Sequence, residues 1–108
     1  METWNIRSLD VEPHRPQVLS SDDESRVIAI QLPGGESMQE HQTHERSLLL
    51  VVEGEVEVSQ GGESIAGEVG FLAEFPPNER REVRARTDSR LLLVLTPWPG
   101  AGHPSRHE

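Results

Sequence analysis

The side chains best suited to chemistry fall in two polar stretches of this chain, at residues 35–54 and 70–85. The first stretch contains His41 and Ser47, and the second contains Arg81. A serine and a histidine could form a nucleophile–base pair, but such a pair needs an orienting acid and an exposed serine. No acid is suitably placed, and both residues would sit on strands. We therefore expect no nucleophilic catalysis.

The composition excludes several other chemistries. There is no cysteine, so disulfides, thiolate metal sites and cysteine nucleophiles are ruled out. All ten basic residues are arginine, which excludes lysine Schiff bases. Because 19 acidic residues give a net charge of −9, we expect neither nucleic acid nor a membrane as a partner. No apolar run has transmembrane length and the N-terminus does not look like a signal peptide, so we expect a cytoplasmic protein.

The elements that must position these side chains are predicted to be β-strands. From residue 26 onward, short apolar or alternating runs recur between glycine and proline turns, and no window has a helical period. This pattern predicts one all-β domain, a sandwich or a barrel. The predicted strands cover residues 27–32, 36–43, 48–52, 56–58, 64–66, 69–75, 80–86 and 90–96.

The chain divides into three predicted parts. Residues 1–25 are expected to form an N-terminal arm, in which Val18 and Leu19 could add a short strand. Residues 26–97 form the predicted barrel. The small and polar residues 98–108 are expected to be a disordered tail, whose two histidines are bystanders rather than ligands.

The two polar stretches resemble the paired motifs of the cupin superfamily. The first motif reads Gly, five residues, His-x-His, three or four residues, Glu, six residues, Gly. The second reads Gly, five residues, Pro-x-Gly, two residues, His, three residues, Asn. The residues that shape the backbone match, together with one histidine: Gly35, His41, Gly54, Gly70 and Pro76. The resemblance implies a double-stranded β-helix, or jelly-roll barrel, of about eight or more short antiparallel strands.

Most metal-ligand positions of the two motifs are not kept. Thr43 stands at the second histidine position, Ser47 at the glutamate, Arg81 at the histidine of the second motif and Ala85 at the asparagine. The divalent metal of the resembled family needs three or four nitrogen or oxygen ligands, and an arginine repels a cation at short range. His41 is the one good metal ligand left among these positions. The resemblance therefore implies the fold of the family but not its metal site.

Strand alternation indicates which of these side chains face the interior. Arg81 alternates in phase with the apolar residues of its strand, and Ser47 with the apolar residues of its own. In the stretch before Ser47, unbroken alternation places His41 and Thr43 on the face of Ser37. The predicted ligand pocket therefore has four members: His41, Thr43, Ser47 and Arg81.

The leading functional hypothesis follows from the predicted position of Arg81 inside the barrel. A buried guanidinium needs a counter-charge or several acceptors, and alternation indicates no inward acid. We therefore expect a binding or sensing module for a small polar or anionic ligand. In the alternative interpretation, Arg81 reaches the barrel mouth and pairs with Glu40, Glu45 or Glu79.

Two further hypotheses belong to other functional classes. The first is a metal-dependent enzyme of the isomerase or dioxygenase type, in which iron, manganese, nickel or zinc is held by His41 and unconventional ligands. His44 is out of phase for this role unless the strand bulges, whereas Glu45 could reach in from the turn. The second is a structural dimer without a ligand.

The predicted strands at residues 48–52 and 91–95 are apolar on both faces. One face fills the barrel, so the N-terminal arm or a second copy of the chain must cover the other. Members of the resembled superfamily commonly dimerise through a sheet. We therefore expect a homodimer.

Overall fold

The computed structural model describes residues 1–42 and 45–96, with the backbone alone for residues 39–42. Thr43, His44 and the predicted tail lie outside the described residues. All strand pairs within the described ranges are antiparallel, and the all-β prediction is confirmed. The elements are η1 (Ile6–Ser8), β1 (Gln17–Ser21), β2 (Arg26–Leu32), β3 (Ser37–Gln42), β4 (Arg46–Glu53), β5 (Val56–Gln60), β6 (Glu63–Gly67), β7 (Leu72–Phe75), β8 (Arg80–Ala85) and β9 (Ser89–Thr96).

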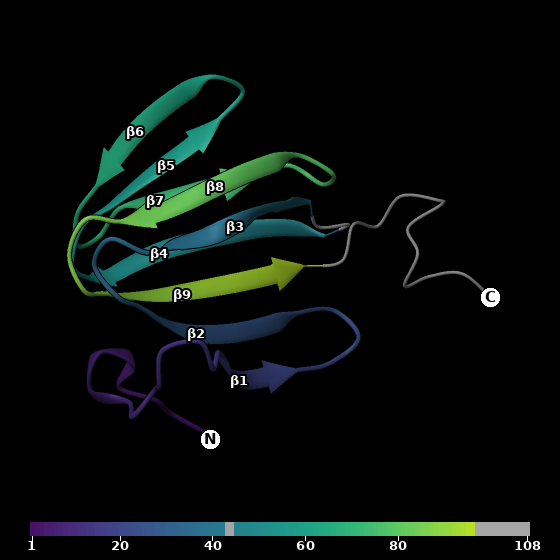
Figure 1. The fold of residues 1–108 in the computed structure, drawn as a ribbon. Coiled ribbons are helices and arrows are strands. Elements are labelled where there is room, and N and C mark those ends of the chain that lie inside the picture. Colours follow the sequence, from purple (N-terminus) through teal and green to yellow (C-terminus); the bar gives the residue numbers. More distant parts are fainter. Residues whose placement is uncertain (43–44, 97–108) are drawn as a thin grey trace.

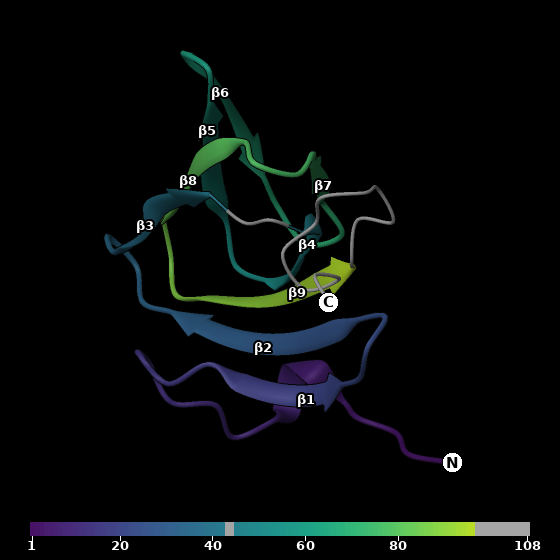
Figure 2. The ribbon, with the colours of Figure 1, turned by 90° about the vertical axis from the view of Figure 1, so that its right-hand side faces the viewer.

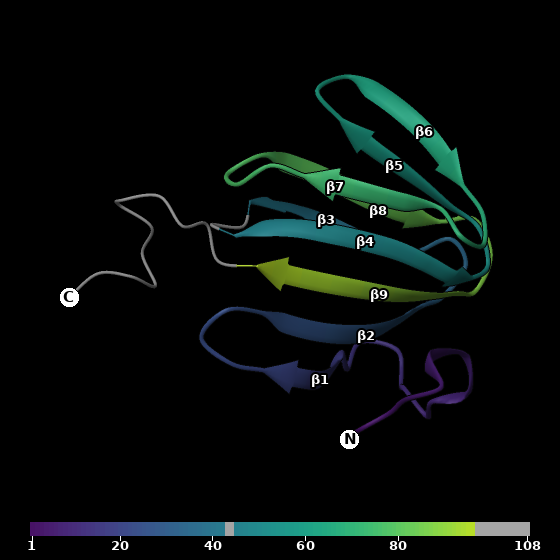
Figure 3. The ribbon, with the colours of Figure 1, turned by 180° about the vertical axis from the view of Figure 1, so that it is seen from behind.

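The strands form two sheets that curl around a shared interior, as in a jelly roll (Figures 1 and 2). The five-stranded sheet has the order β1-β2-β9-β4-β7, and the four-stranded sheet has the order β3-β8-β5-β6. The view from behind shows the β5–β6 hairpin leaning away from β7, so the two sheets are not joined along that side (Figure 3). We call the end of the barrel at which β4 and β8 begin and β7 ends the site end.

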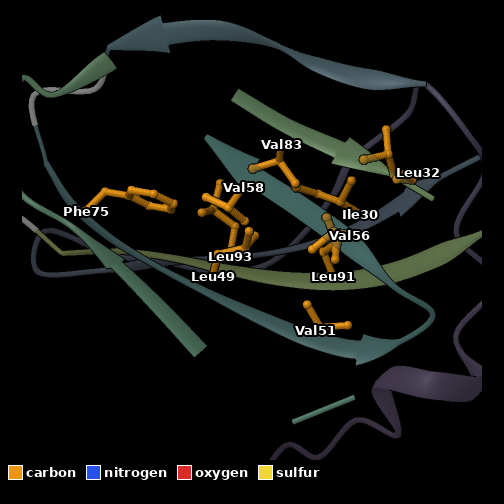
Figure 4. Packing of buried hydrophobic residues seen from close by; sticks show 11 residues of the cluster. Ile30, Leu32, Leu49, Val51, Val56, Val58, Phe75, Val83, Leu91 and Leu93 are labelled. Carbon is orange, nitrogen blue, oxygen red and sulfur yellow. The ribbon is translucent and has the colours of Figure 1, made fainter. Parts of the chain in front are cut away.

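Alternating side chains of both sheets fill the interior. On β4 the buried positions are Ser47, Leu49 and Val51, and on β8 each buried residue is likewise followed by an exposed one. Figure 4 shows Phe75 at one end of the resulting cluster, with Leu32 at the other. The buried apolar residues of the cluster are Ile30, Leu32, Leu49, Val51, Val56, Val58, Phe75, Val83, Ala85, Leu91 and Leu93.

Glycine turns set the ends of the strands. Gly54 has φ +91°, and a Cβ at this position would lie 2.4 Å from Ser89 Oγ, so the turn after β4 requires glycine. The predicted strand over residues 69–75 is too long at its start, because β7 begins only at Leu72. The preceding residues form a turn instead, in which Phe71 N–H donates to the Glu68 carbonyl at 2.8 Å and Gly70 has φ +92°.

The N-terminal arm is fastened to the five-stranded sheet. β1 pairs with β2, and η1 packs against β4 and β9. Arg90, which is 8% exposed, donates from Nη1 to the carbonyls of Ile6 and Leu9, both at 2.8 Å, and from Nε to Gln31. Within the described part of the chain, no helix has the length and apolar character needed to cross a membrane.

Candidate functional site

Arg81 is a buried cation at the site end of the barrel. It is the second residue of β8 and is 3% exposed, on the same inward face as Val83 and Ala85. Its Cζ lies 4.8 Å from the centroid of the Phe75 ring, within the range of a cation–π interaction. Its Nη1 atom is fully buried and has no hydrogen-bond partner among the described residues. The predicted inward orientation of Arg81 is therefore confirmed.

Desolvation changes the ionisation of this group without neutralising it. Burial lowers the pKa of the Arg81 guanidinium from its ordinary value. The ordinary value is so high that the group stays protonated near neutral pH. The interior of the site end therefore holds the positive charge of Arg81, whose Nη1 atom has no hydrogen-bond acceptor among the described residues.

The side chain of Arg81 is buried, so it does not extend into solvent at the barrel mouth as the alternative interpretation has it. Among the three carboxylates considered as its partner, Glu79 accepts a hydrogen bond from Gln60 Nε2 at 3.4 Å. The side chain of Glu40 lies outside the described residues.

Ser47 is the second buried polar group of the site end. It has no exposed surface, and its Oγ atom, like Arg81 Nη1, lacks a hydrogen-bond partner among the described residues. Across the five-stranded sheet, Ser47 pairs with Phe75 on β7 and with Leu95 on β9. Directly opposed residues on neighbouring strands have adjacent side chains. Both Ser47 and Arg81 therefore adjoin Phe75.

His41 reaches the site end through an irregular strand. Ser37 and Met38 pair with Arg84 and Val83, but the register then shifts, so that the His41 Cα lies opposite Arg81. Unbroken alternation was expected for this stretch, and that expectation is wrong. The register shift lies between Met38 and His41, so Ser37 and His41 no longer belong to one two-residue repeat. The His41 side chain and the whole of Thr43 lie outside the described residues.

Phe75 belongs to the site and was not among the predicted pocket residues. It is 3% exposed and links β7 of one sheet to Arg81 on the other. The sequence holds a signal for it, since Phe71, Ala73 and Phe75 alternate on one face just before the Pro76-Pro77 break. Which residue of the other sheet contacts Phe75, however, depends on how the two sheets pack together.

The described residues of the site do not by themselves provide a ligand set for the divalent metal of the resembled family. Among the described residues, no group of three or more His, Asp or Glu side chains could hold a metal ion. Arg81 places a buried positive charge at one of the positions where a ligand would be needed. The arrangement is suited instead to an acceptor of hydrogen bonds that carries negative charge.

Comparisons with known proteins agree with this fold. The family profile described as the cupin domain, Cupin_2, matches residues 27–97. No curated protein sequence matches the chain.

Solved structures share the fold at low sequence identity. An RmlC-like cupin from Desulfovibrio desulfuricans is 19% identical, with a TM-score of 0.78 over 89% of this chain and 96% of that one. A cupin superfamily protein from Desulfitobacterium hafniense is 14% identical, with a TM-score of 0.77 over 85% and 86% of the two chains. An RmlC-like cupin from Shewanella frigidimarina is 20% identical, with a TM-score of 0.76 over 90% of each chain. These three likenesses concern the fold alone, and the profile match over residues 27–97 shows that the chain belongs to the cupin superfamily, in the Cupin_2 family.

Proposed function

We propose that this cupin is a binding or sensing module that holds a small polar anion, with a carboxylate as the preferred group, at Arg81. The observation that carries the proposal is a guanidinium with 3% exposure whose Nη1 atom has no partner among the described residues. Taking such a charge out of water costs several kcal/mol unless hydrogen bonds and an opposite charge replace the lost solvent. A bound anion supplies both.

The chemistry of the neighbours favours a carboxylate. A planar guanidinium presents parallel N–H groups that match the two oxygens of a carboxylate. Because the Phe75 ring lies against Arg81, the directions that suit an anion are those in the guanidinium plane. The buried Ser47 hydroxyl is a further donor without a described partner. His41 and Thr43 complete the proposed pocket.

Thermal unfolding of the full chain in the presence of small anions tests this proposal. We expect formate and acetate to raise Tm in a saturable way, and to do so more than chloride at equal ionic strength. The increase should vanish in Arg81→Met and persist in Arg84→Met, which alters an exposed arginine on the same strand. If Arg81→Met leaves every anion-induced shift in Tm unchanged, the pocket is not an anion site.

The hypothesis of a metal-dependent isomerase or dioxygenase makes the opposite prediction for metal content. Protein purified without added metal would then contain stoichiometric iron, manganese, nickel or zinc, and the His41→Ala variant would lose it. That result would replace the binding module with the enzyme. We expect the metal content to be far below one ion per chain, and Tm to be insensitive to chelators.

We also propose that a second copy of the chain covers part of the outer face of the five-stranded sheet. The cross-strand pairs Leu48–Val94 and Leu50–Leu92 lie on that face and are only partly buried. η1 packs against the same two strands, and Arg7 of η1 pairs with Glu53, at the end of β4 away from the site end. An apolar face that the arm covers only in part favours a homodimer.

A further inference from the structure

A groove opens along the side of the barrel where the two sheets are not joined. It lies between β7, at the edge of the five-stranded sheet, and the β5–β6 hairpin, at the edge of the four-stranded sheet (Figure 3). This lateral groove has a volume of about 290 Å³. Its lining residues are Val58, Gln60, Glu63, Ile65, Phe71, Leu72, Ala73, Glu74 and Phe75.

The lining of the lateral groove is mostly apolar and includes two carboxylates. Val58 and Phe75 belong to the barrel core, and Phe71 and Ala73 pack against that core. Ile65, by contrast, is 57% exposed. Two carboxylates, those of Glu63 and Glu74, also line the groove. The Glu74 carboxylate pairs with the exposed Arg46 at 3.7 Å.

Two residues connect the lateral groove to the anion site. Phe75 lines the groove, and its ring centroid lies 4.8 Å from Arg81 Cζ. Gln60 lines the groove and also a smaller pocket of about 210 Å³ whose lining includes Arg81. The lateral groove thus lies next to the buried cation of Arg81.

We propose that the lateral groove takes the hydrocarbon chain of an amphiphilic monocarboxylate whose head group binds at Arg81. This inference rests on the proposed anion site and specifies its ligand class. Each CH₂ group of the chain occupies a volume close to that of one water in the liquid, ~30 Å³. A volume of about 290 Å³ therefore has room for roughly nine carbons, so that chains up to the length of octanoate fit. A second carboxylate on such a chain would meet the two acidic side chains that line the groove, Glu63 and Glu74, and the net charge of −9, so dicarboxylates are disfavoured.

Calorimetric titration of the full chain with acetate, butanoate, hexanoate and octanoate tests the inference. We expect affinity to rise by about fourfold for each added methylene, the factor that corresponds to burying one CH₂. Octanol, which lacks the charge, and suberate, which has a second one, should both bind at least tenfold more weakly than octanoate.

Groove variants with a matched control make the test specific. Ile65→Asp places a charge in the groove and should remove the gain with chain length, whereas Val69→Asp should keep it. Val69 is 67% exposed and does not line the groove. Ala73→Leu narrows the groove from the β7 side. In this second variant, too, the affinity should no longer rise with the chain length of the carboxylate.

The outcomes separate this inference from the anion site on which it rests. If carboxylates bind in an Arg81-dependent way but octanoate binds no more tightly than acetate, the groove assignment is overturned and the anion site stands. If no carboxylate binds, both are overturned. If octanol binds as tightly as octanoate and Arg81→Met changes neither, the head group does not lie at Arg81 and the inference is again overturned.

Discussion

The guanidinium of Arg81 lies against the ring of Phe75, with 4.8 Å between Cζ and the ring centroid, and this contact spans the two sheets of the barrel. The ring solvates the cation on one side with its π-electrons, which is a weaker stabilisation than a counter-ion gives. The Nη1 atom is left without a partner among the described residues. The contact therefore holds Arg81 in place while leaving the hydrogen-bonding capacity of Nη1 unused among the described residues.

Arg81 is expected to lower the stability of the ligand-free protein. Replacing a buried charge by an apolar side chain of similar length is often neutral or stabilising, by about 1–4 kcal/mol. We expect Arg81→Met to raise the free energy of unfolding within that range, as measured by urea denaturation in a buffer without carboxylates. Arg84→Met, at an exposed position, should change it by less than about 0.5 kcal/mol. A loss of several kcal/mol in Arg81→Met would show that Arg81 has a strong partner within the protein.

Gly54 is expected to be essential for the turn that follows β4, at the end of the barrel away from the site end. A Cβ at this position would lie 2.4 Å from Ser89 Oγ and 2.5 Å from the Asp88 carbonyl oxygen, and φ is +91°. Gly70 has nearly the same φ, +92°, but nothing within 4 Å of its virtual Cβ. Gly70→Ala should therefore report backbone strain alone, at about 1 kcal/mol, while Gly54→Ala adds a steric clash and should cost at least about 2–3 kcal/mol. Equal losses in thermal unfolding would refute the role of the clash.

The outer ion-pair cluster of Arg86, Glu55 and Glu57 is expected to make stability depend on acid pH. Arg86 donates to Glu57 Oε2 at 2.7 Å and to Glu55 Oε1 at 3.0 Å, and the hydrogen bond from Arg86 lowers the pKa of Glu57 below its ordinary value of 4.5. A carboxyl whose folded-state pKa is depressed stabilises the fold above the unfolded value and loses that contribution as the pH falls through the folded value.

Glu57→Gln should therefore be less stable than the wild type at pH 7, and this difference should shrink as the pH falls below about 4.5. Urea denaturation at a series of pH values measures both chains. Arg86→Gln removes the same pair from the other side and should show the same trend. A difference that stays constant from pH 7 to pH 3 would mean that the ion pair does not stabilise the fold.

The proposed homodimer is expected to depend on the partly buried side chains of the five-stranded sheet. Val94→Gln and Leu50→Gln place a polar group on the outer face, where each side chain keeps partial access to solvent. Sedimentation equilibrium should show dimers for the wild type and a weaker dimer, or monomers, for both variants. Val69→Gln, which is exposed and lies outside that sheet, should stay dimeric. A wild-type chain that sediments as a monomer would contradict the proposal.

Much of the fold could be predicted from the sequence. Glycine and proline turns separated the strands, and alternation placed Ser47 and Arg81 on buried faces, as the structure has them. Both signals are local, and they survive folding because one face of each strand must be buried. The largest error in a strand start is at β7, which begins three residues later than predicted because a turn at Gly70 takes the residues before it.

The details of the candidate site were less predictable. The register shift in β3 inserts a residue that no alternation pattern reveals, and it brings the His41 Cα opposite Arg81. The contact between Phe75 and Arg81 depends on how the two sheets face each other, which is a property of the whole barrel. The lateral groove arises because β6 and β7 do not pair, and it was not predicted for the same reason.

The central claim is that Arg81 binds a carboxylate, and the most direct test is a nuclear magnetic resonance titration that observes the arginine side-chain N–H signals. Adding acetate at constant ionic strength should shift the Arg81 Nε–H signal in a saturable way. The exposed arginines, such as Arg84 and Arg26, should show only small and linear changes. If the Arg81 signal does not move, or moves no more than those of the exposed arginines, the proposed anion site is contradicted.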